Sequence, residues 1–192
     1  MKSLLLTLLF VSITTFSFSQ EEKKDEDKKS TIEATPEVNF GVRGGLNISN
    51  LDFKPDPTFA NKHRNGFAFG AFVDYGITGT FSILTELQYS AEGADAESLR
   101  ADYIQLPILF RFSLGEFFKI GAGPMVSLKT WEFEDGFSTF TFSGVAGIEY
   151  MITDELFIDA RVHYGFTNIL DKDLTMTKAK FTTIQFGFGL KI

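Results

Sequence analysis

The chain contains no cysteine among its 192 residues, and this absence removes a whole group of chemistries. Disulfide bonds, thiolate metal sites and cysteine nucleophiles are excluded, although an oxidising compartment is not. Basic residues are also few: 18 Lys and Arg stand against 25 Asp and Glu, and no Lys/Arg cluster is free of acids. Nucleic-acid binding requires a basic patch, so we predict no nucleic-acid partner.

The sequence also lacks an apolar run long enough for a comfortable transmembrane helix. The apolar stretch near the N-terminus, within MKSLLLTLLFVSITTFSFSQ, is short and is interrupted by Ser and Thr. Lys2 precedes it and small residues follow it, so we predict a signal peptide over residues 1–19, cleaved before Gln20. An uncleaved anchor is the alternative. The following EEKKDEDKKS carries nine charges in ten residues, which predicts a charged disordered linker over residues 20–36.

Alternation with a period of two residues is abundant in the rest of the chain. In the segment FTTIQFGFGLKI the apolar side chains fall on every second position: Ile184, Phe186, Phe188, Leu190 and Ile192. Seven earlier segments show the same period, which predicts β-strands. Their connections alternate between long and short, as in antiparallel neighbours with tight turns at one end. We therefore predict an all-β fold over residues 37–192, an eight-stranded antiparallel up-and-down transmembrane β-barrel.

The two faces of the predicted strands differ in side-chain size. Bulky apolar residues such as Phe110, Phe142 and Phe186 share one face, while glycines such as Gly121 and Gly147 lie on the other. An eight-stranded barrel is only just wide enough inside for its own side chains, so the glycine-rich face should point inward. The bulky face then contacts lipid, and the barrel must close because an open edge in lipid leaves backbone groups unpaired. A soluble barrel that binds a ligand in an apolar interior is an alternative.

The predicted inward face carries ionisable residues of both signs. Charges held away from bulk water must pair, so we predict a lumenal charge network with a structural role. Its members are Arg43, Asp74, Glu86, Arg111, Glu149, Asp159, Arg161 and Lys191. We expect its centre near Glu86, Arg111, Asp159 and Arg161, as a plug of salt bridges that closes the pore. A proton or ion path is the alternative.

Aromatic residues and the two histidines complete the candidate sites. Residues near the strand ends suit the aromatic girdles at the two membrane interfaces, although they could instead be core aromatics of a soluble sandwich: Tyr75, Tyr89, Tyr150, Tyr164 and Trp131. His63 falls in the first long loop, and His163 points inward as a hydrogen-bonding residue without a nucleophile in reach. We predict no enzymatic activity, no catalytic residue and no cofactor. We also predict no metal, because no acidic segment matches a known ligand loop.

Several segments resemble a known family. They are FGVRGGLNIS from Phe40, ELQYSAEGA from Glu86, YIQLPILFRF from Tyr103, GPMVSL from Gly123 and ARVHYGFTNI from Ala160. In this order they resemble the PorT-type outer-membrane β-barrel proteins of the Bacteroidetes, over roughly residues 37–192. The chain departs from the pattern at Arg111, where Lys is expected, and at Ile192, where an aromatic residue is preferred. The resemblance implies an outer-membrane location, and the secretion role of the founding member is not carried over.

Together these patterns predict a small outer-membrane protein of a Gram-negative bacterium. We expect a closed, salt-bridged lumen and a structural or interaction role through the extracellular loops, especially those around residues 49–64 and 167–180. A narrow conduit or secretion-accessory barrel is the alternative. The expected partners are outer-membrane lipid and, during insertion, the barrel-assembly machinery. The sequence does not identify an extracellular or periplasmic partner.

Overall fold

A computed structural model of the protein describes residues 37–58, 61–130, 137–170 and 178–192. The predicted signal peptide and linker, and Trp131, lie outside the described residues. The described part of the chain contains one short 3-10 helix, η2 (Glu97–Leu99), and eight strands: β1 (Val38–Lys54), β2 (Arg64–Gly76), β3 (Phe81–Gly93), β4 (Arg100–Leu114), β5 (Phe118–Lys129), β6 (Phe140–Met151), β7 (Leu156–Gly165) and β8 (Lys178–Lys191). No helix in these ranges is long and apolar enough to cross a membrane.

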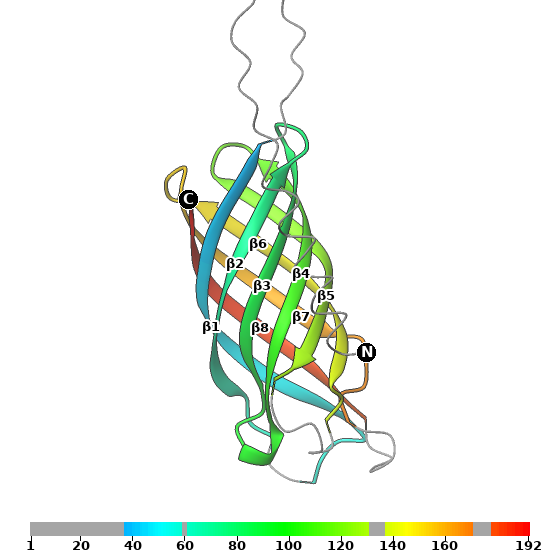
Figure 1. Cartoon of the computed structure of the whole chain (residues 1–192). Helices are drawn as coiled ribbons and strands as arrows, with labels where there is room; N and C mark the ends of the chain where they lie inside the picture. Colours follow the sequence, from blue (N-terminus) through cyan, green and yellow to red (C-terminus); the bar gives the residue numbers. More distant parts are fainter. Residues whose placement is uncertain (1–36, 59–60, 131–136, 171–177) are drawn as a thin grey trace, which may run out of the picture. The chain divides into compact units, whose positions relative to one another are not determined.

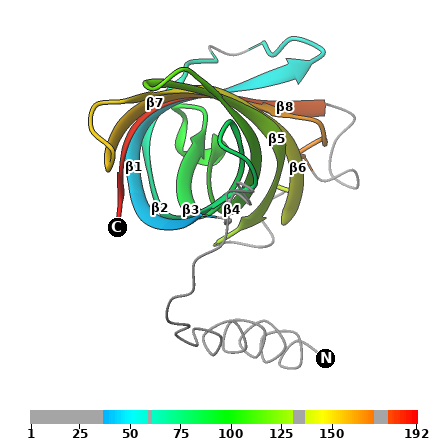
Figure 2. The ribbon, with the colours of Figure 1, turned by 90° about the horizontal axis from the view of Figure 1, so that it is seen from above.

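The strands form a closed antiparallel barrel in which each pairs with its neighbour in sequence (Figure 1). β1 also pairs with β8, from Gly41 opposite Lys191 to Lys54 opposite Lys178, and this pairing closes the ring (Figure 2). Every strand has ten or more residues, which is enough to cross the hydrocarbon layer at the usual tilt. The predicted eight-stranded up-and-down topology is therefore confirmed.

Side chains alternate between the outer wall and the lumen as their size predicted. Phe110, Phe142 and Phe186 lie on the outer wall with 44%, 46% and 53% of their surface exposed. Glu86 and Arg161 point inward and are 0% and 2% exposed. The apolar face points outward over most of the length of the strands. The alternative of a soluble barrel with an apolar ligand-binding interior is therefore wrong. Tyr75, Tyr89, Tyr150 and Tyr164 all alternate outward, at the strand ends where interfacial girdles occur.

The connections differ between the two ends of the barrel. Short turns over residues 77–80, 115–117 and 152–155 share one end with the C-terminus, and we call this the turn end. At the other end, which we call the loop end, the strand ends are separated by longer stretches of sequence: residues 55–63, 94–99, 130–139 and 166–177 (Figure 1). The predicted loop over residues 49–64 is too long, because β1 continues to Lys54 and β2 starts at Arg64. The predicted loop over residues 167–180 likewise includes the start of β8.

The strands extend into these predicted loops because their polarity inverts near the loop end. Asn50, Asp52 and Lys54 alternate outward, while Leu51 and Phe53 alternate inward. The inward residues join an apolar core at the loop end: Leu51, Ala94, Ala101, Tyr103, Phe137, Ile169, Ala179 and Phe181. A strand above the membrane meets water on its outer face, so it needs polar residues outside and apolar residues inside. We call this group the loop-end core.

A second apolar cluster fills part of the lumen: Phe72, Leu84, Leu109, Met125, Val145, Met151 and Phe157. Phe72 and Phe157 meet edge to face, with ring centroids 5.7 Å apart. Each ring lies against a glycine of β1 or β8, Gly41 or Gly189, where any side chain would collide with it. The expectation of an inward face made only of small and ionic residues is therefore too simple.

Candidate functional site

Arg43 occupies the middle of a buried ion-pair cluster in the lumen. Its Nε donates a hydrogen bond to Asp159 Oδ2 at 2.6 Å, and a second guanidinium nitrogen pairs with Asp159 Oδ1. The third nitrogen donates to Gln185 Oε1 and lies 3.8 Å from Glu86 Oε1. Arg43 thus connects β1 to β7 and β8, beside the closing β1–β8 pair, and to β3 across the lumen. A two-nitrogen contact with one carboxylate is the strongest geometry that arginine offers.

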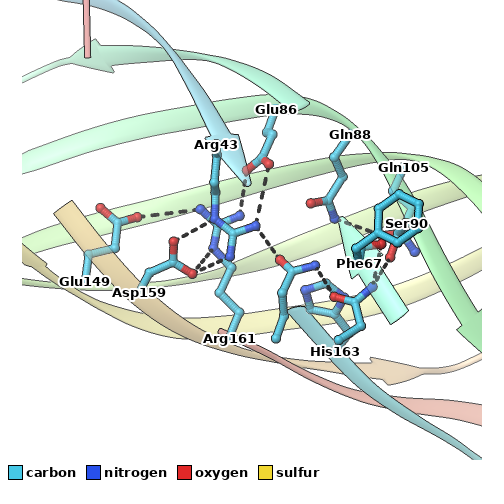
Figure 3. Close-up of polar contacts among 12 residues, drawn as sticks. Arg43, Phe67, Glu86, Gln88, Ser90, Gln105, Glu149, Asp159, Arg161 and His163 are labelled. Atoms are coloured by element: carbon cyan, nitrogen blue, oxygen red, sulfur yellow. Dashed lines mark hydrogen bonds and ion pairs between the residues drawn. The ribbon is translucent and has the colours of Figure 1, made fainter. Parts of the chain in front are cut away.

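Arg161, on β7, extends the same cluster (Figure 3). Its Nη1 donates a hydrogen bond to Glu86 Oε2 at 2.6 Å, and its Nε lies 3.5 Å from Asp159 Oδ1. Its Nη2 lies 3.9 Å from Glu149 Oε1. Glu86 and Asp159 are each therefore shared between two arginines, which compensates their charge in the absence of bulk water.

Arg111, on β4, organises a second group closer to the turn end. Its Nη1 donates to Glu149 Oε2 at 2.6 Å, and its Nη2 pairs with Asp74. Nη2 also donates to Ser82 Oγ at 3.3 Å. The contact between Arg161 and Glu149 joins this group to the first one, so a chain of ion pairs crosses the lumen.

The structure brings together seven of the eight residues that the sequence placed in a lumenal network. Lys191 is only half-buried, and its side chain makes no ion pair with any residue that the structure describes. The centre also differs from the expectation: Arg43 contacts Glu86 and Asp159, whereas Arg111 contacts Glu149 and Asp74. The stagger between strands fixes which inward residues share a level, and a sequence pattern does not contain that stagger.

Glycines make room for the three arginines. A methyl group at Gly147 would lie 2.8 Å from Arg161 Cγ, and one at Gly121 would lie 2.8 Å from Arg111 Cγ. At Gly187 the clash would be with the guanidinium of Arg43, at 2.5 Å. Each long side chain therefore lies flat across a neighbouring strand at a position without a side chain. This arrangement explains why glycine is frequent in strands that it otherwise weakens.

A layer of amide and hydroxyl side chains, together with the carboxyl group of Glu92, lies between the ion pairs and the loop-end core. Gln185 Nε2 donates to Asn47 Oδ1 at 2.8 Å, and Asn47 Nδ2 donates to Ser90 Oγ at 2.9 Å. Gln88 Nε2 donates to Gln105 Oε1 at 2.8 Å, and Gln105 Nε2 donates to Glu92 Oε1 at 3.0 Å. We call these residues the amide layer. Sequence reasoning did not identify them as a network, although their inward register was a usable signal.

The two histidines do not form a catalytic group. His163 is 2% exposed, and its Nδ1 lies 3.6 Å from Glu92 Oε1, which is too far for a hydrogen bond. Neither ring nitrogen of His163 has a hydrogen-bond partner among the described residues, so the predicted hydrogen-bonding role is not confirmed. His63 pairs with Ala94 in an isolated backbone bridge at the loop end. Across residues 37–58, 61–130, 137–170 and 178–192, no group of three or more His, Asp and Glu side chains is placed to hold a metal ion.

Chemically, this lumen is a plug. Three guanidinium groups face four carboxylates from Asp74, Glu86, Glu149 and Asp159, and the three arginine side chains are each 1% exposed. Pairs of this kind hold charge in place, because separating one partner leaves the other uncompensated in a poorly hydrated interior. The amide layer and the loop-end core then close the lumen toward the loops.

Comparisons with known proteins agree with this architecture. The family model described as "Outer membrane protein beta-barrel domain" matches residues 3–191. No curated protein sequence matches the chain. The crystal structure of Ail, the attachment invasion locus protein of Yersinia pestis, has a TM-score of 0.54 and 14% identity, covering 81% of this chain and 99% of Ail. Neisserial surface protein A has a TM-score of 0.55 and 15% identity, covering 80% of this chain and 97% of its own. At such identities these similarities show the fold alone.

Proposed function

The chain belongs to the outer membrane protein beta-barrel domain family, and we propose that it is a closed barrel that presents its loops to a partner outside the cell. It is a small outer-membrane barrel with eight strands and a salt-bridged lumen. In barrels of this class the short turns face the periplasm and the longer loops face the exterior. This orientation places the loop end outside the cell.

One observation carries the proposal: the lumen is filled from the turn end to the loop end. Ion pairs occupy the part around Arg43, Arg111 and Arg161, and the loop-end core occupies the part above the amide layer. An eight-stranded barrel has just enough room for such side chains. A filled lumen supports a structural or interaction role over transport. Loops that extend beyond the membrane on a rigid barrel are then the surface available to a partner.

Single-channel recording in planar bilayers tests the closed barrel. We expect the folded wild-type protein to give no current steps above the bilayer baseline. Glu86→Gln and Arg111→Gln provide the comparison, because a conduit that uses the lumenal charges should change its current when either charge is removed. Stable current steps in the wild type that fall in these variants would replace our proposal with a narrow conduit.

The finer features of the protein's export are also part of the proposal. They comprise a signal peptide over residues 1–19, cleavage before Gln20, a linker over residues 20–36, a barrel domain over residues 37–192 and insertion by the barrel-assembly machinery of a Gram-negative cell. We include PorT-type membership, which the segments quoted above support, and the absence of enzymatic activity. Cell fractionation with N-terminal sequencing of the mature chain tests the location and the cleavage site. Recovery of the mature chain in the periplasmic soluble fraction would contradict insertion into the outer membrane.

A further inference from the structure

Three lysines gather on the outer wall at the loop end of β1 and β8. Lys54 and Lys178 are direct register partners, and Lys180 is the partner of Asp52. All three alternate outward; Lys54 and Lys178 are exposed and Lys180 is half-buried. The ammonium group of Lys180 lies over the ring of Tyr164, 5.6 Å from its centroid. We call this group the lysine wall.

The lysine wall is electrostatically incomplete. Like charges directly opposite each other on neighbouring strands destabilise a sheet, and Lys54 and Lys178 are such a pair. Neither makes an ion pair with any residue that the structure describes. Asp52 is the one acidic register partner here, and it also accepts a hydrogen bond from Thr182 at 2.5 Å. Among the outward residues that the structure describes on this part of β1 and β8, three ammonium groups lie beside one carboxylate, an arrangement that favours an external anion.

The rim over the next strands, from β2 to β4, differs. There Arg64 pairs with Asp102 at 3.0 Å, and Tyr89 donates to the same carboxylate at 2.8 Å. Arg100 lies 3.9 Å from Asp95. The positive charges of β2 and β4 are thus matched within the protein. Among the described residues of these strands, unmatched positive charge gathers on β1 and β8.

The lysine wall lies just above the headgroup region of the outer leaflet. The last apolar outward pair on these strands is Ile48 and Ile184, and Lys180 follows Ile184 four residues closer to the loops. At 3.4 Å per residue and a tilt of 35–45°, Lys180 lies about 10 Å above that pair, and Lys54 and Lys178 lie about 5 Å higher. Each headgroup region is about 5–8 Å thick, and a lysine side chain can bend toward it. Tyr164, beneath Lys180, occupies the aromatic girdle.

We propose that Lys54, Lys178 and Lys180 form a binding site for the phosphate group of an outer-leaflet glycolipid. The inference rests on the proposed orientation, in which the loop end faces the exterior. Lysine binds phosphate as a point charge and requires no particular fork geometry, which suits a mobile lipid headgroup. The bound phosphate would relieve the repulsion between Lys54 and Lys178. The lipid's acyl chains would lie along the apolar wall below, beside Ile48, Ile184 and Phe186.

The test is a lipid-binding measurement on the detergent-folded full chain by native mass spectrometry. The probe is a phosphorylated disaccharide glycolipid, compared with the same lipid after enzymatic removal of its phosphate. A lysine near an anionic lipid surface contributes about fivefold in affinity, so replacing all three lysines with Gln should weaken binding about 100-fold. The triple Arg variant should retain binding. Lys62→Gln, an exposed lysine of the β1–β2 loop, is the matched control and should leave affinity unchanged.

Each outcome decides the proposal. Because the lysines are on the surface, their variants should keep the heat-modifiable gel mobility of a folded barrel, and this is checked first. Equal binding of the two lipids, or an undiminished affinity in the triple Gln variant, would overturn the inference. Displacement of the lipid by millimolar inorganic phosphate would show a site for free anions instead. The measurement needs no closed lumen, so its failure is distinguishable from a failure of the conductance test.

Discussion

The membrane-spanning part of the barrel and its loop end are built with opposite polarity on the same strands. In β8, Phe186 faces lipid and is 53% exposed, whereas Phe181 points into the loop-end core and is 4% exposed. Gln185 points inward to the ion pairs, whereas Lys180 points outward at the loop end. The backbone alternation continues without interruption. The medium outside the wall therefore decides which chemistry each face carries, while the strand geometry stays constant.

The two regions also differ in how they resist change. The lumenal network depends on the pairing of opposite charges, because each buried charge is stabilised by its neighbours. The loop-end core depends on excluded water and close packing, which are lost in proportion to the atoms removed. The following four substitutions, in order of expected effect, test this distinction by reversible urea unfolding of the folded protein in lipid vesicles.

Arg161→Met should be the most destabilising of the four. It leaves Glu86 without its 2.6 Å partner in the buried lumen, and removal of one partner of a buried pair costs about 3–5 kcal/mol. The double variant Arg161→Met/Glu86→Gln should recover part of this loss, because it removes the uncompensated charge as well. A double variant that is as unstable as the sum of the two single variants would contradict the role assigned to the pair.

Leu51→Ala, in the loop-end core, should lower the free energy of unfolding by about 2–5 kcal/mol. The loss comes from buried apolar surface and a cavity, so no second substitution of a charged residue should recover it. Combining Leu51→Ala with Arg161→Met gives the control. The two sites share no partner, so the losses should add within about 0.5 kcal/mol. A strongly non-additive result would mean that the two regions unfold as one coupled unit.

Gln105→Leu, in the amide layer between the two regions, should lower the free energy of unfolding by about 1–3 kcal/mol. It removes the hydrogen bond that Glu92 accepts at 3.0 Å and the acceptor of Gln88, and buried polar groups left without partners carry this penalty. The loss should be smaller in Gln105→Glu/Glu92→Gln, which exchanges the two side chains. An equal loss in the exchanged variant would indicate that volume, not hydrogen bonding, sets the cost.

Tyr89→Phe should have the smallest effect, about 0.5–1.5 kcal/mol. It removes a single hydrogen bond to Asp102 at the outer wall, where the partner keeps its contact with Arg64. This variant calibrates the cost of a peripheral polar contact in the same assay. A loss comparable to that of Arg161→Met would remove the distinction between the lumen and the wall.

Much of the barrel could be predicted from the sequence because period two and side-chain size are local properties. The outward placement of Phe110 and Phe186 and the inward placement of Arg43 and Glu86 follow from alternation together with side-chain size. The loop-end core could not be predicted in this way. Leu51 and Phe181 have the inward register but the opposite polarity from the residues below them, so the pattern was interpreted as the end of the strands.

The pairing within the lumen was beyond the sequence for a different reason. Arg43 meets Asp159 and Gln185 because β1 pairs with β8 at one particular stagger, with Arg43 opposite Gly189. Alternation specifies whether a side chain points into or out of the barrel. It does not specify the position of that side chain along the barrel axis, which depends on the stagger between strands. Lys191 was included in the network by its inward register, yet it lies near the end of β8 and remains half-buried. Membership of the lumenal network therefore depends on a residue's position along the barrel axis as well as on the inward direction of its side chain.

The contacts of Arg43 also bear on the order of events during assembly. Its carboxylate partner lies 116 residues further along the chain, and its amide partner 142 residues further. Contacts over such separations form late, since the intervening chain must first be ordered. A truncated chain that lacked β7 and β8 would therefore leave this guanidinium without its hydrogen bonds and the ring open. The charge of Arg43 on the first strand is therefore fully paired only after the last two strands have joined the barrel.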